Sequence, residues 1–419
     1  MPAEKIFSLK HKVIVIGAGP AGCLAASYLQ RKGVEVLVIE KESFPRFVIG
    51  ESLLPATMSH LEEAGLLEHI IDMPFQKKYG ARFIDDESTC TFTFDEQYTT
   101  SYGWTWQVQR ADFDLALVEA ARKNGVQFRF NTTVTKFDNA NPENPVVHIL
   151  TKHGEESQLA GDYVIDASGY GRVLPRLLDL NNPSEMPERG AVFTHVRDSK
   201  RSAFDESRIT IYNLSNDAWL WHIPFADGTT SVGMVGEKQD IESYAANGGE
   251  RFKNFVQDYE PLKNRYNSDS FVFEPKSNLG YSIGVKQMFG PGYVLCGNST
   301  EFLDPIFSSG VALATASGLQ AAKLIVRQLL GEKVDWQRDY EDYMKQGLSV
   351  FKTYVSTWYT GELKTIFFSS QIAPEIKKQI CSVLAGHVWD VTNPFVKNHS
   401  RLVATLAKVI TIENQKPLA

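Results

Sequence analysis

Residues 12–40 read KVIVIGAGPAGCLAASYLQRKGVEVLVIE, and this stretch decides the fold. The β-branched run Lys12–Ile16 predicts a buried parallel strand, and the alanine-rich run Cys23–Lys32 predicts a helix. Gly33 ends that helix, and Val34–Ile39 predicts a second strand. A strand, a helix and a second strand within about 30 residues form a βαβ unit, the setting in which a glycine-rich turn binds phosphate.

The turn between the first strand and the helix follows the pattern GxGxxG. Gly17 allows the tight turn, Gly19 lets the backbone approach a pyrophosphate, and Gly22 lets helix and strand pack closely. The helix N-terminus adds free N–H groups and a partial positive charge. Glu40 closes the second strand, where a carboxylate can bind a ribose diol. The predicted cofactor-binding residues of this unit are Gly17, Ala18, Gly19, Pro20, Ala21, Gly22, Glu40 and Lys41; a purely structural glycine turn is the alternative.

The composition excludes several classes of protein. The chain has 419 residues, 43% of them hydrophobic and 22% charged, as expected for two or three folded domains. Its net charge of −7 argues against a nucleic-acid partner. Four separated cysteines without a CxxC pair argue against disulfides or a metal site. Because the apolar runs are shorter than a membrane span and the N-terminus does not resemble a signal peptide, we expect a cytoplasmic enzyme.

The middle of the chain differs in character from the two parts around it. An amphipathic helix at Arg110–Asn124 and a strand at Tyr163–Asp166 continue the βαβ type of structure. Four turn-separated runs then predict an antiparallel sheet, because they are short and rich in β-branched and aromatic residues. These runs are Ala191–Val196, Arg208–Tyr212, Ala218–Ile223 and Thr230–Val235. Tyr293–Cys296 again predicts a buried strand of the βαβ type. Beyond Asp335 the sequence predicts helices.

A second loop leads into an alanine-rich helix from about Gly310 to Leu330. The loop contains Gly297-Asn298-Ser299 and residues 304–311, DPIFSSGV. The N-terminus of the helix would point its positive end at a second part of the cofactor, and an isoalloxazine ring that becomes anionic on reduction suits such an end. NAD would instead place its nicotinamide at the ends of the following parallel strands, so the pattern favours FAD.

We therefore expect an α/β fold: a Rossmann-type FAD-binding domain, an inserted antiparallel sheet that faces the substrate, and a C-terminal helical segment. The predicted FAD-binding domain comprises residues 1–75, 107–185 and 285–335. The predicted sheet domain comprises residues 76–106 and 186–284, and the C-terminal region residues 336–419.

Four motifs resemble those of the flavin-dependent halogenases, a family within the FAD-dependent monooxygenases and geranylgeranyl reductases. Residues 44–55, FPRFVIGESLLP, are similar to the family's segment after the second strand, and WLWHIP at residues 219–224 fits its signature WxWxIP. Lys78-Tyr79-Gly80 is similar to the element that carries the family's essential lysine. The loop at residues 304–311 is similar to the halide-binding loop. The resemblance covers residues 10–335 and is loose over 336–419.

The resemblance implies catalytic roles for Lys78, Trp219 and Trp221. The two tryptophans alternate on a strand, so both rings face one side and would separate the flavin from the substrate; two ordinary core aromatics are the alternative. Lys78 would hold and polarise hypochlorous acid, or carry chlorine as a chloramine. A solvated lysine is the alternative there.

The resemblance also implies a halide site and further cofactor contacts. Chloride or bromide, as co-substrate, would bind at Ser309 and Gly310 at the helix N-terminus. The alternative is that the serines only cap the helix. The further cofactor-binding residues are Arg46, Ser52, Arg110, Asp166, Asn298, Asp304, Gly310 and Val311.

Two departures from the family pattern narrow the substrate. Asn298 stands where the family usually has aspartate, and Phe307 stands where tryptophan halogenases have glutamate. The implied substrate is therefore not free tryptophan but a small electron-rich aromatic, a phenol or a pyrrole, free or tethered to a carrier protein. A separate flavin reductase would supply reduced FAD.

Two other functions are open at this point. An FAD-dependent monooxygenase, or a reductase of the geranylgeranyl-reductase type, shares GxGxxG and Phe-Pro-Arg, and would turn over NADPH without halide. A flavin-binding protein without activity is the third interpretation, because Asn298 lacks the charge of the usual aspartate. The sequence leaves open the substrate, the halide and the oligomeric state.

Overall fold

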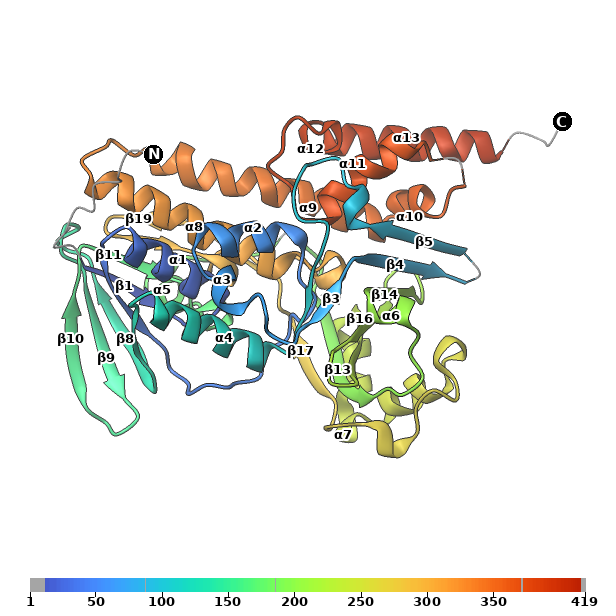
Figure 1. Ribbon diagram of the computed structural model, residues 1–419, viewed down its shortest axis with the longest axis horizontal. Helices are drawn as coiled ribbons and strands as arrows, with labels where there is room; N and C mark the ends of the chain where they lie inside the picture. The colour runs from blue at the N-terminus through green and yellow to red at the C-terminus, as the bar shows by residue number, and fades with distance from the viewer. Residues whose placement is uncertain (1–11, 87, 185, 371, 416–419) are drawn as a thin grey trace.

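The computed structural model describes residues 12–86, 88–184, 186–370 and 372–415. The outer ends of the first and last predicted segments, 1–11 and 416–419, lie outside the described residues, and so does most of the stretch compared with a signal peptide. Within the described chain, two large sheets stand side by side and a helical region lies along both (Figure 1).

A six-stranded sheet carries the GxGxxG turn. Its order is β19-β20-β11-β1-β2-β7, and every neighbouring pair is parallel except β19 with β20. The strands are β1 (Lys12–Ile16), β2 (Glu35–Ile39), β7 (Gln127–Arg129), β11 (Tyr163–Asp166), β19 (Phe289–Gly290) and β20 (Tyr293–Leu295). The central strands are buried on both faces, which explains their continuous apolar sequences.

Three helices cover one face of this sheet: α1 (Pro20–Arg31), α4 (Arg110–Lys123) and α8 (Ser309–Leu329). α1 begins at Pro20, earlier than predicted, because proline is well tolerated in the first helical turn. α1 and α8 approach closely at Gly318, where an added Cβ would lie 2.4 Å from the carbonyl oxygen of Ala21. Among the described residues, α8 alone is long and apolar enough to cross a membrane, and 72% of its apolar window is buried inside the protein.

The second large sheet has seven strands in the order β17-β13-β16-β15-β14-β4-β5. They are β4 (Gly80–Asp85), β5 (Ser88–Thr93), β13 (Arg189–Arg197), β14 (Arg208–Asn213), β15 (Trp219–Pro224), β16 (Thr229–Glu237) and β17 (Lys276–Leu279). The four predicted strands pair antiparallel with one another, as expected. The sheet as a whole is mixed, because β4 joins β14 in parallel after a long connection. Helix α7 (Lys238–Asp258) packs on one face.

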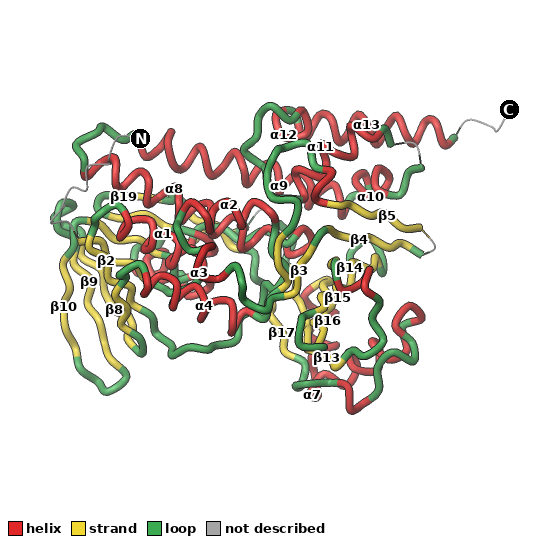
Figure 2. Tube along the Cα trace, viewed as in Figure 1, coloured by secondary structure: helices red, strands yellow, loops and turns green. Residues whose placement is uncertain are grey.

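The C-terminal region is helical, as predicted. Its helices are α9 (Tyr343–Tyr359), α10 (Glu362–Phe367), α11 (Pro374–Leu384), α12 (Pro394–Lys397) and α13 (His399–Asn414). Figure 2 shows this region along one side of the molecule, over β4 and β5. Aromatic side chains join the layers: the ring centroids of Phe92 and Phe367 are 4.9 Å apart, and those of Phe307 and Trp358 are 6.1 Å apart.

Smaller elements complete the described chain. A three-stranded sheet consists of β8 (Thr132–Asp138), β9 (Val146–Thr151) and β10 (Glu156–Ala160). Two two-stranded sheets consist of β3 (Gln76–Lys78) with β6 (Thr105–Gln107), and β12 (Asn181–Pro183) with β18 (Ile283–Val285). The short helices are α2 (Pro55–Glu63), α3 (Leu67–Ile70), α5 (Val173–Leu177) and α6 (Ala203–Glu206).

Candidate cofactor cavity and halide loop

One cavity is lined by strand residues of the seven-stranded sheet and by the loops that follow strands of the six-stranded sheet. It brings together most of the predicted site residues: Gly17, Gly19, Pro20, Ala21, Glu40, Lys41, Arg46, Ser52, Arg110, Trp219, Trp221, Asn298, Gly310 and Val311. The remaining predicted residues are buried and do not form its described lining: Ala18, Gly22, Lys78, Asp166, Asp304 and Ser309.

The three glycines of the turn are required for different reasons. Gly17 has φ +100°, and a Cβ there would lie 2.5 Å from the carbonyl oxygen of Ala167. A Cβ on Gly22 would lie 2.0 Å from the carbonyl oxygen of Gly17. Gly19 differs, because a Cβ there would meet only the guanidinium of Arg46, at 3.7 Å. The fold needs the first and third glycines, whereas the second leaves space in the cavity wall where a pyrophosphate can approach.

Glu40 and Lys41 end β2 at the edge of the cavity. The Glu40 carboxylate accepts hydrogen bonds from the backbone N–H groups of Ala18, at 2.9 Å, and Glu42, at 3.0 Å. This carboxylate therefore braces the turn while it lines the cavity, where a ribose diol fits. Lys41 is exposed, and its ammonium lies 3.4 Å from Glu42.

Asp114 orients both predicted arginines and was not among the predicted site residues. Its carboxylate lies 3.1 Å from Nη1 of Arg46 and accepts two hydrogen bonds from Arg110, at 2.8 and 3.0 Å. Asp114 is fully buried, so it compensates the charge of two guanidinium groups in the cavity wall. The spacing of Arg110 and Asp114, four residues apart on a predicted helix, was the available signal.

Asp166 ends β11, and Asn298 lies in the loop that follows β20. The Asp166 carboxylate accepts hydrogen bonds from the backbone N–H of Ser168 and of Leu174 and from the hydroxyl of Ser299. It therefore holds the loops around the cavity together. Asn298 lines the cavity, and its backbone carbonyl oxygen accepts a hydrogen bond of 3.0 Å from Nη1 of Arg172.

The loop before α8 turns the helix N-terminus towards the cavity. Asp304 accepts a hydrogen bond of 3.0 Å from the backbone N–H of Ile306, which starts a tight turn. Ser308 then adopts left-handed φ/ψ angles of 56° and 26°, and its side chain makes no capping hydrogen bond. Serine capping is therefore the wrong interpretation. Ser308, Gly310 and Val311 line the cavity at the positive end of a 21-residue helix.

Trp219 and Trp221 lie side by side in the cavity wall. Both are buried, both line the cavity, and their ring centroids are 5.9 Å apart. The indole N–H of Trp221 donates a hydrogen bond of 3.0 Å to the hydroxyl of Ser231. Its ring lies on Gly233, where an added Cβ would come within 2.2 Å of it. The strand alternation therefore correctly predicted a shared face.

Lys78 is buried, and the neighbouring Lys77 is exposed. The Lys78 ammonium donates hydrogen bonds of 2.8 Å to the hydroxyl of Ser52 and to the carbonyl oxygen of Leu53. It also lies 5.2 Å from the centroid of the Phe94 ring. Burial lowers the pKa of Lys78 to about 7. The interpretation as a solvated lysine is wrong, and Ser52 connects Lys78 to the cavity wall.

One buried pair in the cavity wall had no signal in the sequence. The imidazole Nε2 of His195 lies 2.8 Å from a carboxylate oxygen of Glu51, which lines the cavity. By contrast, His222 lies outside the described cavity lining, and its Nε2 hydrogen-bonds the hydroxyl of Tyr266 at 2.7 Å.

The residues present fit FAD: the open side of Gly19, the carboxylate of Glu40 and the positive ends of α1 and α8 all meet one cavity. Residues 10–221 match the family described as FAD binding domain. The chain is 43% identical to a crystal structure of a flavoprotein/dehydrogenase from Cytophaga hutchinsonii, with a TM-score of 0.93 over 97% of this chain and 100% of that one.

Further matches are to halogenases. The chain is 30% identical, over 90% of each chain, to the 1H-pyrrole-2-carbonyl-(peptidyl-carrier protein) chlorinase of Pseudomonas fluorescens. It is 27% identical to the structure of the flavin-dependent brominase Bmp2, with a TM-score of 0.80 over 97% of this chain and 100% of that one.

The fold and cavity, together with these matches, define an FAD-dependent oxidoreductase with a Rossmann-type FAD-binding fold. Within that class, the chain belongs to the flavin-dependent halogenase family.

Proposed function

We propose that this protein halogenates a small electron-rich aromatic ring, with chloride or bromide as co-substrate. The observation that carries the proposal is the joint placement of a helix N-terminus, two tryptophans and a buried lysine around one cofactor cavity. The overall reaction consumes an aromatic C–H, a halide ion, a proton, O2 and reduced FAD, and yields a carbon–halogen bond, FAD and two waters. Bound reduced FAD would activate O2, and O2 would supply the oxidising equivalents that convert the halide to hypohalous acid.

The halide would bind at the loop before α8. The free N–H groups of the first helical turn favour an anion, and Ser309 and Gly310 hold these positions. Since Ser308 and Gly310 line the same cavity as the cofactor residues, a halide there would lie next to the oxidant.

Trp219 and Trp221 would exclude the aromatic substrate and water from the flavin side of the cavity. Their burial, and the packing of Trp221 on Gly233, support a fixed wall. In this proposal the sheet segments 76–106 and 186–284 face the substrate, and the segments 1–75, 107–185 and 285–335 hold FAD. The remaining cofactor contacts assigned from the sequence, including Lys41 and Val311, stay part of the proposal.

Lys78 would direct the hypohalous acid to the substrate. With a pKa of about 7, its side chain is present as ammonium and as free amine near neutral pH. The ammonium donates a hydrogen bond to the oxidant and polarises it, and the amine accepts halogen as a haloamine. Both routes need a desolvated lysine, and in both the reacting nitrogen is the one that contacts the Ser52 hydroxyl.

The substrate class follows from the halide loop and the relatives. Phe307 gives the loop an apolar side chain that packs against Trp358, in place of the carboxylate of tryptophan halogenases. The Pseudomonas fluorescens relative acts on a pyrrole carried by a peptidyl-carrier protein. We infer a pyrrole or phenol, tethered to a carrier protein, as substrate, a separate flavin reductase as partner and the cytoplasm as location.

One assay tests this function. The purified protein is incubated with FAD, a flavin reductase, NADH, O2, bromide and either a free phenol or a pyrrole-loaded carrier, and the product is followed by mass. A mass increase that depends on bromide supports halogenation. Turnover of NADPH without the reductase and without halide would instead identify a monooxygenase or reductase.

A further inference from the structure

A chain of hydrogen bonds joins the C-terminal helical region to the halide loop and the tryptophan wall. The indole N–H of Trp219 donates a hydrogen bond of 2.9 Å to the hydroxyl of Tyr359, the last residue of α9. That hydroxyl donates a hydrogen bond of 3.0 Å to Oδ2 of Asp304. The other oxygen, Oδ1, accepts from the backbone N–H of Ile306. The Tyr359 hydroxyl therefore contacts both the tryptophan wall, at Trp219, and the halide loop, at Asp304.

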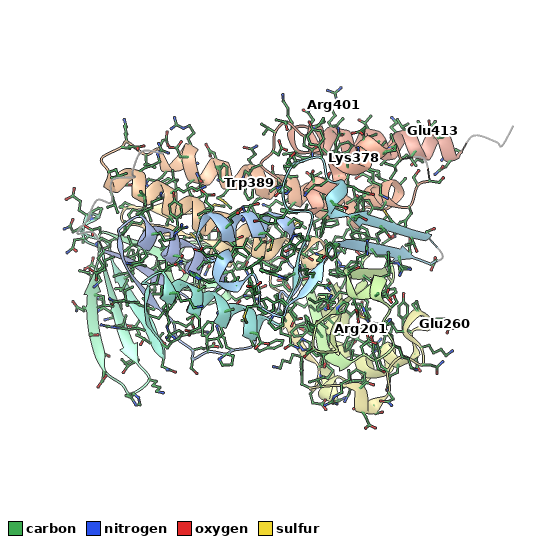
Figure 3. The ribbon with its side chains drawn as sticks, viewed as in Figure 1. Arg201, Glu260, Lys378, Trp389, Arg401 and Glu413 are labelled. Atoms are coloured by element: carbon green, nitrogen blue, oxygen red, sulfur yellow. The ribbon has the colours of Figure 1, made fainter. Side chains whose placement is uncertain are left out.

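Tyr359 is held rigidly where it makes these contacts. The guanidinium of Arg189 lies 3.5 Å from the centroid of its ring, and Arg189 is itself anchored to the carbonyl oxygen and carboxylate of Asp217. At the other end of α9, Trp389, labelled in Figure 3, stacks on Tyr343 with centroids 5.2 Å apart. The indole N–H of Trp389 also donates a hydrogen bond of 2.8 Å to the Tyr343 carbonyl.

We propose that Tyr359 is a positioning residue that sets the halide affinity of the loop and the orientation of Trp219. Through it, the C-terminal region acts on the halide site. This inference rests on the proposed function, because it presupposes that the loop binds halide.

The hydrogen bond from Tyr359 matters because it stabilises the buried carboxylate of Asp304. Asp304 is buried, and burial raises its pKa to about 6, so its carboxylate is costly to hold in the ionised form. The donors on it are the Tyr359 hydroxyl and the Ile306 N–H, and Arg189 and Tyr281 are the other charged or titratable groups facing it. Without the Tyr359 hydroxyl, Oδ2 would lose its donor beside a site for anions. The loop would then have to move, and the amides that meet the halide would move with it.

Tyr359→Phe removes this hydroxyl and keeps the ring over which Arg189 lies. Tyr354→Phe is the matched control, because Tyr354 is buried on the same helix and its hydroxyl has no hydrogen-bond partner among the described residues. Bromide is titrated into each FAD-loaded protein, and its Kd is read from the visible absorbance of the flavin. In the FAD-free proteins, the ¹⁵N–¹H signal of the Trp219 indole is followed by NMR, and the Trp219→Phe variant identifies that signal.

We expect Tyr359→Phe to raise the bromide Kd about tenfold, as the loss of a hydrogen bond to a charged group predicts. The FAD Kd should stay within about twofold of the wild type, since nucleotide contacts are untouched. The Trp219 indole signal should shift upfield. Tyr354→Phe should leave the bromide Kd, the FAD Kd and the indole signal unchanged.

The outcomes distinguish a failure of the proposed function from a failure of the positioning role of Tyr359. If the wild type binds no bromide, the proposed function is wrong, and the indole signal still reports whether the tyrosine holds Trp219. If the wild type binds bromide and Tyr359→Phe binds it equally well, the positioning role is wrong and the proposed function stands. A loss of affinity that Tyr354→Phe shares would also overturn the inference, because it would reflect a general loosening of α9.

Discussion

The ammonium of Lys78 lies 2.8 Å from the hydroxyl oxygen of Ser52, and Ser52 is part of the cavity wall. A buried lysine that needs two neutral oxygen acceptors is costly to fold, so this arrangement is unusual for a lysine that serves stability alone. Lys78 itself lies outside the described cavity lining and contacts the wall through Ser52. This relationship makes the role of the lysine separable from FAD binding.

Lys78→Ala should uncouple flavin oxidation from halogenation. The variant loses the group that orients the oxidant, and a hydrogen bond to a charged group contributes about 1.5–3 kcal/mol, so product per reduced FAD should fall at least about tenfold. Consumption of reduced FAD and O2 should continue at the wild-type rate. The measurement is a parallel assay of O2 uptake and halogenated product.

Lys77→Ala is the control for that experiment. Its side chain is exposed and lies over the ring of Trp104, 4.9 Å from the centroid, on the other face of β3. It should halogenate normally. An inactive Lys77 variant, or an active Lys78 variant, would show that the lysine has been assigned wrongly.

The buried lysine also makes the stability of the protein depend on pH. The pKa of Lys78 is about 7 in the folded protein and near the ordinary 10.5 when unfolded, so folding releases a proton between these values. Its contribution to stability is present above pH 10.5 and is lost as the pH falls towards 7, by at most about 1.4 kcal/mol per pH unit. Lys78→Met removes this titration.

The corresponding experiment is urea unfolding of the wild type and Lys78→Met at pH 6.5, 8 and 9. The free energy of unfolding of the wild type, minus that of the variant, should rise by about 2 kcal/mol across this range. In Lys78→Met, the Ser52 hydroxyl and the Leu53 carbonyl lose their hydrogen bonds to the lysine. This loss lowers the free energy of unfolding of the variant by an amount that does not vary with pH. Parallel pH profiles for the two proteins would mean that Lys78 titrates near its ordinary pKa.

The fold was predictable where the decisive signal was local. The βαβ unit and the strand Tyr163–Asp166 follow from short apolar runs and the glycine turn, and they appear in the structure as expected. The parallel pairing of β4 with β14 joins residues 80–84 to residues 208–212 and has no local signal. Packing in the folded chain selects this pairing of distant strands, so the sequence predicted a purely antiparallel sheet.

The candidate site also contains both features with a local sequence signal and features without one. The burial of Lys78 and the exposure of Lys77 follow from strand alternation, so the period of β3 was a usable signal. The contact between Glu51 and His195 joins positions 144 apart in the sequence and could not be predicted from either residue. The contact between Tyr359 and Asp304 joins positions 55 apart and also had no local signal, because α9 meets the loop before α8 only through tertiary packing.

Bromide should bind at the N-terminus of α8. Crystals grown with FAD and soaked in bromide should show an anomalous peak beside the backbone N–H groups of Ser309 and Gly310. The reason is that the side chain of Ser308 leaves the helix uncapped next to the cavity. Chloride at high concentration should remove the peak. Peaks confined to surface lysines and arginines would count against a halide site in this loop.

FAD binding should depend on Gly19 in a way that the fold does not. Gly19 has ordinary extended backbone angles, φ −77° and ψ −175°, and a side chain there would meet only the flexible end of Arg46. Gly19→Val should therefore fold, with a melting temperature of the FAD-free protein close to that of the wild type. Its side chain would occupy the approach of the pyrophosphate, so the FAD Kd should rise by about 100-fold, or about 3 kcal/mol.

Gly22→Val separates this effect from a general disturbance of the turn. A Cβ at Gly22 would lie 2.0 Å from the carbonyl oxygen of Gly17, so this variant must move the backbone and should melt well below the wild type, since overpacking costs about 1–3 kcal/mol or more. Isothermal titration with FAD and calorimetric melting of both FAD-free variants distinguish the two cases. A Gly19→Val protein with wild-type affinity for FAD would place the pyrophosphate elsewhere, and one that melts as low as Gly22→Val would show that Gly19 serves the fold.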